Sequence, residues 1–310
     1  MPSCRQSLKT VFSTCPFDYA LRPRAFEYYA PTELSEALTL LSETDDAKIL
    51  AGGQSLITLM KLKLTSPASL IDINRIKELN YIREESGALL IGALTRHDQL
   101  AKSALIRQRC LLLAEAAGVI ADQQVRNRGS IGGSLAHADP SADLSTACTA
   151  LNVQIIAASR EGRRSIPAGD FFLDFFTTAL RRDELIVEVR IPLPSAGSGG
   201  AYWKLTKGHN DFALVAVAVQ AALNRSGSCE RVSVVLGGFS SKPTHAIETE
   251  KVLTQRRVDD RTLHEAASKA TDGLTPTPDS RATADSKCKL ARFLAERTLR
   301  VAFNRAGGVI

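Results

Sequence analysis

The segment LAGGQSL, residues 50–56, places two adjacent glycines between a short apolar run and a mostly apolar, helix-like run. Glycine adopts positive φ and, lacking a Cβ, lets a ligand approach the backbone closely. Where such a loop leads into a helix, its N–H groups and the helix dipole favour phosphate oxygens. Ser55 is placed to cap that helix, which we predict over residues 55–64. A plain structural turn also explains a Gly-Gly pair, so both interpretations stay open here.

A second segment, RNRGSIGGSLAHADPSADL (126–144), repeats the Gly-Gly pair in a richer context. The Ser130 and Ser134 hydroxyls and the backbone amides suit a pyrophosphate, and a carboxylate from Asp139 or Asp143 suits a ribose or ribityl hydroxyl. A divalent metal site competes for these two aspartates, although two carboxylates form a small ligand set. The chain contains neither a P-loop motif nor a G-x-G-x-x-G motif after a strand, which argues against kinase-type and Rossmann nucleotide sites.

The composition is that of an ordinary globular protein of 310 residues, with 23% charged residues and a net charge of +6. This length allows two domains, or one large domain with a satellite. No run approaches the roughly 20 apolar residues of a membrane-spanning helix, and the N-terminus lacks the apolar stretch of a secretory signal. We therefore expect a cytoplasmic protein. The six cysteines lie far apart, without the spacing of zinc or iron–sulfur ligands, and the scattered basic residues do not indicate nucleic-acid binding.

The pattern of apolar residues predicts an α+β protein with two lobes that join near residues 180–200. Leu34, Ala37, Leu38 and Leu41 form one helical stripe, and residues 97–121 read as helix broken in two. PSAGSGG (194–200) is the clearest composition break. Further strands are predicted at 47–53, 68–76, 88–95, 152–159 and 185–194, and a three-stranded antiparallel sheet at 201–207, 213–223 and 231–239.

The chain resembles, from about Pro23 to its C-terminus, the FAD-binding medium subunit of molybdenum hydroxylases. This family includes aerobic carbon monoxide dehydrogenase, xanthine dehydrogenase and N-heterocycle dehydrogenases. The number of motifs that occur in order makes the resemblance specific, whereas either glycine segment alone would not. The motifs that carry the resemblance are FEYYAPTELSEAL (26–38), KILAGGQSLITLMKLKL (48–64), IDINRIKEL (71–79), IGALTRH (91–97), QVRNRGSIGGSLAHADPSADL (124–144), FFTTALRRDELIVEVRIP (175–192) and YWKLTK (202–207).

The resemblance implies a flavoprotein fold of the PCMH or vanillyl-alcohol-oxidase type. An N-terminal extension (1–22) precedes an FAD-binding domain of two subdomains (23–195). A C-terminal domain (196–310) with a three-stranded antiparallel sheet and helices completes the cleft.

The resemblance also implies which residues hold non-covalent FAD. Asp143, with Asp139 as a second candidate, takes a ribose or ribityl hydroxyl, and Ile120 lines the adenine end. Leu185 and Ile186 contact the flavin, and Lys204 lies beside the isoalloxazine, where a cation stabilises reduced, anionic flavin. Asn210 replaces a usual glycine, and asparagine tolerates the left-handed backbone needed there. The two pyrophosphate loops comprise Leu50, Ala51, Gly52, Gly53, Gln54, Ser55, Leu56 and Ile57, and Ser130, Ile131, Gly132, Gly133 and Ser134.

The implied function is that of an electron-transfer subunit, without a catalytic or metal-binding residue of its own. A large subunit holds the molybdopterin, a small subunit holds two [2Fe–2S] clusters, and FAD in this chain passes electrons to an external acceptor, in a dimer of heterotrimers. The alternatives are a self-contained flavin oxidase, a flavin-free assembly or scaffolding module, and an α+β protein with coincidental glycine turns. Replacing Gly53 or Gly132 with valine is expected to release flavin and leave the fold largely intact.

Overall fold

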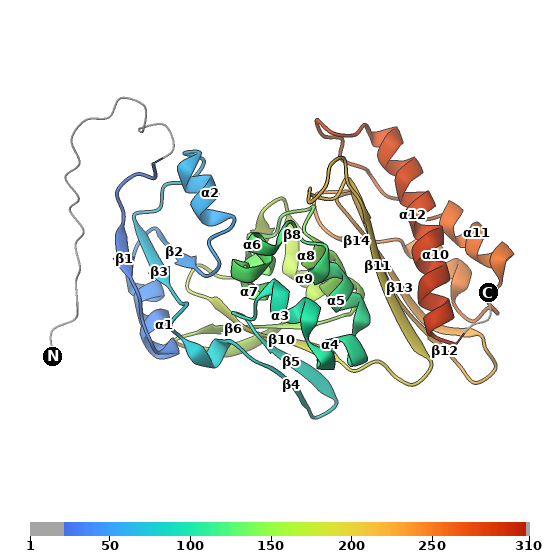
Figure 1. Ribbon diagram of the computed structural model, residues 1–310, viewed down its shortest axis with the longest axis horizontal. Helices are drawn as coiled ribbons and strands as arrows, with labels where there is room; N and C mark the ends of the chain where they lie inside the picture. The colour runs from blue at the N-terminus through green and yellow to red at the C-terminus, as the bar shows by residue number, and fades with distance from the viewer. Residues whose placement is uncertain (1–21, 308–310) are drawn as a thin grey trace.

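Three main β-sheets follow one another across the protein from its N-terminal to its C-terminal part (Figure 1). The computed structural model describes residues 22–307. The extension predicted at residues 1–22 lies outside the described residues, except for Arg22. Helices fill the space between the second and third sheets and contact the third sheet.

The first sheet is parallel, because helical crossovers separate its strands in the chain. Its order is β1-β3-β2: β1 (Glu27–Tyr29), β3 (Ser69–Asp72) and β2 (Ala47–Leu50). The crossover helix α1 (Leu34–Glu43) buries the predicted stripe of Leu34, Ala37, Leu38 and Leu41. After β2, the chain passes through the Gly-Gly pair into α2 (Leu56–Lys61), which is shorter than the predicted helix. A 3₁₀ turn, η1 (Lys77–Leu79), leads to the next sheet.

The second sheet is antiparallel and has β10 at its centre. Its strands lie in the order β4 (Ile82–Glu85), β5 (Ala88–Gly92), β10 (Leu185–Pro192), β6 (Gln154–Ser159) and β7 (Gly162–Pro167). The sequence predicted β5, β6 and β10, but not the two mostly exposed edge strands β4 and β7. A β-bulge between Ile186 and Glu188 interrupts the pairing of β10 with β6.

Short helices cover this sheet and link it to the third. The stretch predicted as two helices forms three, because the chain turns at Ser103 and again at Cys110. The second Gly-Gly pair was expected in a loop, but it lies in the first turn of α7, which Ser130 caps. The elements are α3 (His97–Lys102), α4 (Ala104–Arg109), α5 (Leu111–Gly118), α6 (Gln123–Arg128), α7 (Ile131–His137), α8 (Asp143–Ala150), α9 (Ala168–Phe171), β8 (Phe172–Asp174) and β9 (Thr177–Thr178).

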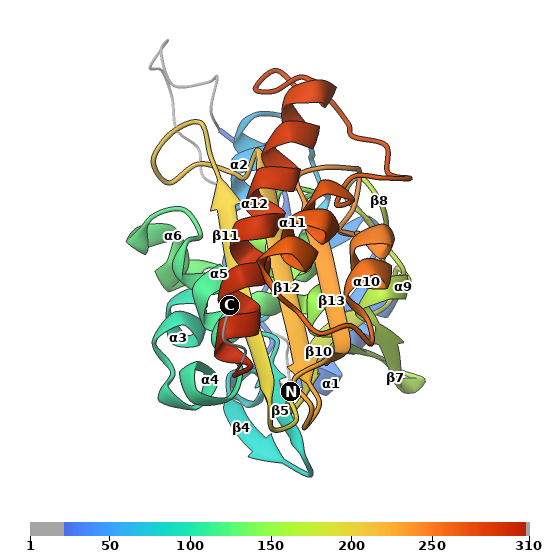
Figure 2. The ribbon, with the colours of Figure 1, turned by 90° about the vertical axis from the view of Figure 1, so that its right-hand side faces the viewer.

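The third sheet is antiparallel, with the long helix α12 (Ala284–Arg305) running along the face of β11 and β12 (Figure 2). Helices α5 and α8 contact its other face. The three predicted strands are present, and a two-residue strand, β14, extends the sheet to four. The remaining elements are β11 (Ser198–Leu205), β12 (Val215–Leu223), β13 (Cys229–Gly237), β14 (Thr244–His245), α10 (Ile247–Leu253) and α11 (Asp260–Ser268).

These elements confirm the predicted α+β class. One apolar core lies between the second sheet and the helices that cover it, and a separate core lies between the third sheet and α10 to α12. Within residues 22–307, no helix is long and apolar enough to cross a membrane.

Candidate functional site

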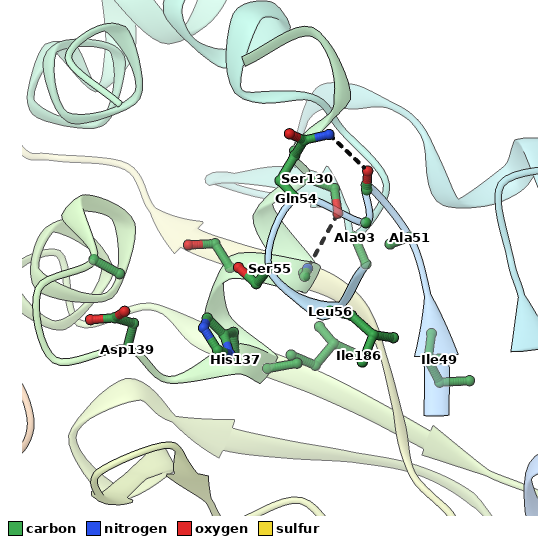
Figure 3. A pocket seen from close by; sticks show the side chains of 18 of the residues that line it. Ile49, Ala51, Gln54, Ser55, Leu56, Ala93, Ser130, His137, Asp139 and Ile186 are labelled. Atoms are coloured by element: carbon green, nitrogen blue, oxygen red, sulfur yellow. Dashed lines mark hydrogen bonds between the residues drawn. The ribbon is translucent and has the colours of Figure 1, made fainter. Parts of the chain in front are cut away.

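A cavity of about 840 Å³ is lined by residues from the regions of all three main sheets. Its volume falls in the range of roughly 300–1,000 Å³ that is common for small-molecule sites. Its walls come from the loop between β2 and α2, from the helical region 120–143, from the start of β10 and from the end of β11. Figure 3 shows side chains from several of these segments around the cavity.

The first glycine segment (residues 50–57) offers the cavity a run of free backbone donors. The N–H groups of five consecutive cavity-lining residues, Gly52 to Leu56, have no hydrogen-bond acceptor within residues 22–307. Ser55 occupies the N-cap position of α2, yet its hydroxyl caps no backbone group there. The Gln54 side chain instead donates to the Gly52 carbonyl at 3.3 Å (Figure 3). Free amides and a free hydroxyl at a helix start suit an anion such as a pyrophosphate.

A hydrogen-bonded brace holds the first glycine segment in place. Asn74 donates to the Ala51 carbonyl at 2.7 Å and accepts from Arg96 at 2.6 Å, and Arg96 also donates to the Arg128 carbonyl at 2.5 Å. Gly52 lies so close to the Arg128 carbonyl that a Cβ would overlap it. Sequence reasoning assigned no role to Asn74 or Arg96. Their only signal was that both lie in motifs that carry the resemblance, IDINRIKEL and IGALTRH.

The second glycine segment (residues 130–134) uses most of its amides within the fold. The Ile131 N–H donates to the Thr95 carbonyl at 3.0 Å, and the Gly132 N–H donates to the Ala93 carbonyl at 2.9 Å. The Gly133 N–H donates to the Ser130 hydroxyl at 3.3 Å (Figure 3). This segment therefore presents its serine side chains to the cavity rather than a row of free amides.

A buried ion pair lies at the end of the cavity formed by α8 and β11. The Asp143 carboxylate accepts from the Tyr202 hydroxyl at 2.6 Å and from the Lys204 ammonium at 3.1 Å. Burial raises the pKa of Asp143, while Lys204 and Tyr202 oppose that rise. Burial and the neighbouring Asp143 raise the pKa of Tyr202 well above its usual value. Sequence reasoning predicted Asp143 and Lys204 separately, but it did not pair them and did not identify Tyr202.

Asp139 and His137 also line the cavity but are engaged locally. Asp139 accepts from the Ser141 N–H at 2.8 Å, which forms a turn, and the His137 ring contacts Phe176 at a centroid distance of 5.2 Å. Within residues 22–307, no three His, Cys, Asp or Glu side chains come together as metal ligands. The competing metal interpretation of Asp139 and Asp143 therefore gains no further ligand from this part of the chain.

A buried histidine that the sequence analysis did not single out also lines the cavity. His97 lines the same cavity as Ile120 and packs directly against Gly129, and its Nδ1 has no hydrogen-bond partner among the described residues. Burial, assisted by the nearby Arg96 and Arg126, lowers the pKa of His97 to about 4. The imidazole is therefore neutral at neutral pH.

Most of the residues predicted for the site meet at this cavity. Asn210 has a positive φ of 59°, which confirms the left-handed backbone expected there. Leu50, Ile57 and Ile131 do not line the cavity. The predicted residues that do are Ala51, Gly52, Gly53, Gln54, Ser55, Leu56, Ile120, Ser130, Gly132, Gly133, Ser134, Asp139, Asp143, Leu185, Ile186 and Lys204.

The donors fit a dinucleotide cofactor, and comparison with known proteins defines the class. Residues 24–194 match the family described as the FAD binding domain in molybdopterin dehydrogenase. Residues 200–302 match the CO dehydrogenase flavoprotein C-terminal domain. The protein is thus a flavin-binding subunit of an oxidoreductase, and the chain belongs to the molybdenum hydroxylase medium-subunit family. The predicted family, enzyme class and FAD cofactor are confirmed.

Characterised relatives support this assignment over nearly the whole chain. The chain is 38% identical to the 6-hydroxypseudooxynicotine dehydrogenase complex subunit alpha of Paenarthrobacter nicotinovorans, covering 92% of this chain and 97% of the relative. It is 38% identical to the carbon monoxide dehydrogenase medium chain of Hydrogenophaga pseudoflava, covering 91% and 99%.

Solved structures confirm the fold. A structure of carbon monoxide dehydrogenase from Hydrogenophaga pseudoflava superposes with a TM-score of 0.88 at 39% identity, covering 92% of this chain and 99% of that one. Quinoline 2-oxidoreductase from Pseudomonas putida 86 superposes with a TM-score of 0.87 at 32% identity, covering 92% and 99%. The predicted FAD-binding domain with a C-terminal antiparallel sheet is therefore confirmed.

Proposed function

We propose that this chain is the electron-transfer subunit of a molybdenum-containing hydroxylase or dehydrogenase. Electrons pass from [2Fe–2S] clusters of a small partner subunit to non-covalent FAD in this chain, and from there to an external acceptor. A large partner subunit holds the molybdopterin centre, in a cytoplasmic dimer of heterotrimers. We also propose the division into an FAD-binding domain (23–195) and a C-terminal domain (196–310). The observation that carries the proposal is the cavity, which joins five free backbone donors to a buried Lys–Asp pair.

The geometry supports a distinct role for each wall of the cavity. The free amides of residues 52–56 and the Ser55 hydroxyl hold the pyrophosphate, and the Ser130 and Ser134 hydroxyls complete this part of the site. Ile120 lines the adenine end, together with the neutral His97. FAD supplies the redox chemistry when it is bound, and the protein supplies binding, orientation and electrostatics.

At the opposite end, Leu185 and Ile186 form the apolar wall for the isoalloxazine. Both side chains are buried at the start of β10. Asp143 from α8 and Lys204 from β11 face the same part of the cavity. In this proposal Asp143, or secondarily Asp139, accepts from a ribityl or ribose hydroxyl. Because the Asp143 oxygens already accept from Tyr202 and Lys204, such a hydroxyl would share an oxygen with one of them.

The direct test is an absorption spectrum of the purified full chain with added FAD, before and after heat precipitation. Flavin bands that move to the supernatant on heating support non-covalent FAD, while bands that stay in the pellet indicate covalent flavin and favour a self-contained oxidase. A protein that remains colourless with excess FAD would contradict flavin binding. Copurification of large and small subunits with a tagged chain tests the partner assignment, and a chain that purifies alone with substrate-oxidising activity would refute it.

A further inference from the structure

Tyr202 and Lys204 extend from one strand of the third sheet to a single carboxylate on a helix of the other domain. Both residues belong to β11, two positions apart, and Asp143 begins α8. The Tyr202 hydroxyl donates to one carboxylate oxygen at 2.6 Å and the Lys204 ammonium donates to the other at 3.1 Å. Lys204 also donates to the Asp211 carbonyl at 3.2 Å. The carboxylate and the ammonium each have two fixed partners.

All three side chains are withdrawn from water, so solvent screens their interaction little. Tyr202 is 4% and Asp143 is 6% exposed, and the Lys204 side chain is 9% exposed. Asp143 and Lys204 line the cavity, whereas Tyr202 lies behind Asp143 and does not. Tyr202 therefore does not touch a ligand in the cavity, and its hydroxyl reaches the cavity wall through Asp143.

This pairing changes the charge expected at the cavity wall. An unpaired lysine would present a full positive charge, but the Asp143 carboxylate balances the Lys204 ammonium at hydrogen-bond distance. A cation beside flavin favours its reduced, anionic form and a carboxylate opposes this, because the charges act through a weakly polarisable interior. The pair therefore offsets much of the effect that Lys204 would have alone.

We propose that Tyr202 is a positioning residue that holds Asp143 as the counter-charge of Lys204, and so keeps the reduction potential of the bound flavin below the value that an unpaired lysine would give. This inference rests on the proposed function. Without its hydroxyl, the buried carboxylate loses one of the two side-chain donors that stabilise its ionised form. Lys204 and Tyr202, both on β11, are the titratable groups acting on Asp143 among the described residues.

The test measures the flavin midpoint potential of the FAD-loaded full chain by dye equilibration at neutral pH. Asp143→Asn removes the counter-charge and is expected to raise the potential, and Tyr202→Phe is expected to raise it by a smaller amount. Lys204→Gln is expected to lower it. Tyr81→Phe is the matched control, because Tyr81 also donates to a buried carboxylate, Glu188, but neither residue lines the cavity. This control should leave the potential unchanged.

The outcomes separate the inference from the proposed function. Wild-type chain that fails to bind FAD contradicts the proposed function itself. If FAD binds and Tyr202→Phe keeps the wild-type potential while Asp143→Asn shifts it, Tyr202 only fills space and the inference fails. If Asp143→Asn also leaves the potential unchanged, the pair does not act on the flavin. Should Tyr202→Phe fold poorly, Tyr202→Met takes its place, since it also removes the hydroxyl and keeps an adaptable apolar side chain at this buried position. An unchanged potential in that variant would likewise overturn the inference.

Discussion

The two Gly-Gly pairs look alike in the sequence, but they use glycine for different physical reasons. Gly53 has a φ of +75°, and the residues around it leave five backbone N–H groups free within the described part of the chain. Gly132 has an ordinary helical backbone and sits against Ala93, where a Cβ would lie 2.7 Å from the Ala93 Cβ. Gly53 opens the backbone toward the cavity, whereas Gly132 lets a helix pack closely against the end of a strand, much as Gly52 allows a close approach to Arg128.

This difference shows that a glycine motif does not by itself identify which atoms face a ligand. In both segments a serine precedes the first turn of a helix, yet only Ser130 caps its helix. The Ser55 hydroxyl is wholly available to a ligand, while the Ser130 hydroxyl already accepts from the Gly133 N–H and has its own proton left to donate. The predictions below test this contrast, beginning with the largest expected effect.

Gly132→Val is expected to destabilise the fold rather than only to release flavin. The Cβ of the new side chain would lie 2.7 Å from the Ala93 Cβ and 2.9 Å from the Ala93 carbonyl oxygen, so both contacts are collisions. Overpacking of this kind costs about 3 kcal/mol. The structure thus overturns the sequence-based expectation that this variant keeps the fold largely intact.

Thermal unfolding of the flavin-free chain measures this effect. Gly208→Val is the control, because Gly208 has ordinary φ and open space around it. Its unfolding free energy should change by less than about 0.5 kcal/mol. Equal melting temperatures for Gly132→Val and wild type would show that α7 does not depend on this close approach.

Gly53→Ala is expected to have a moderate effect on stability and to weaken FAD binding. A Cβ in the left-handed region costs about 1–2 kcal/mol, and relief of that strain would turn the neighbouring amides away from the cavity. Asparagine tolerates this conformation, so Gly53→Asn should retain more affinity. Fluorescence titration of FAD with both variants checks the order, and equal loss in both would mean that backbone conformation is not the cause.

Paired serine variants give the smallest and most direct contrast. Ser130→Ala should lower the unfolding free energy by about 1 kcal/mol, because it removes a helix cap. Ser55→Ala should change it by less than about 0.5 kcal/mol, since no backbone donor among the described residues depends on that hydroxyl. Ser55→Ala should instead weaken FAD affinity about fivefold, because it removes one hydrogen bond to the ligand.

Chemical denaturation and FAD titration of the same two proteins separate these effects. A stability loss in Ser55→Ala equal to that in Ser130→Ala would remove the proposed distinction between the two segments.

The sequence predicted those helices and strands whose buried apolar residues recur at the regular spacing of a helix or form a continuous apolar strand. The stripe of α1 and the strands β5, β6 and β10 were read correctly because their apolar residues face a core. The mostly exposed strands β4 and β7 lack that signal. Helix α7 was taken for a loop because its two glycines are poor helix formers. Tertiary packing against Ala93 overrides this preference.

The site was predicted less completely, because its polar partners come from distant parts of the chain. The resemblance pointed to Asp143 and Lys204, but their pairing joins residues 61 positions apart. Tyr202 and the Asn74–Arg96 brace have no local sequence pattern that distinguishes them from other polar residues. Such contacts become visible only when the fold brings the segments together.

The position of β10 has a consequence for how the chain is made. β10 pairs with β5 on one side and β6 on the other, although it is the last of these strands to leave the ribosome. Until β10 has emerged, β5 and β6 each lack their partner on that side, and such open edges pair readily with other chains. The central sheet can therefore close only after β10 has been made, and until then β5 and β6 cannot pair through it.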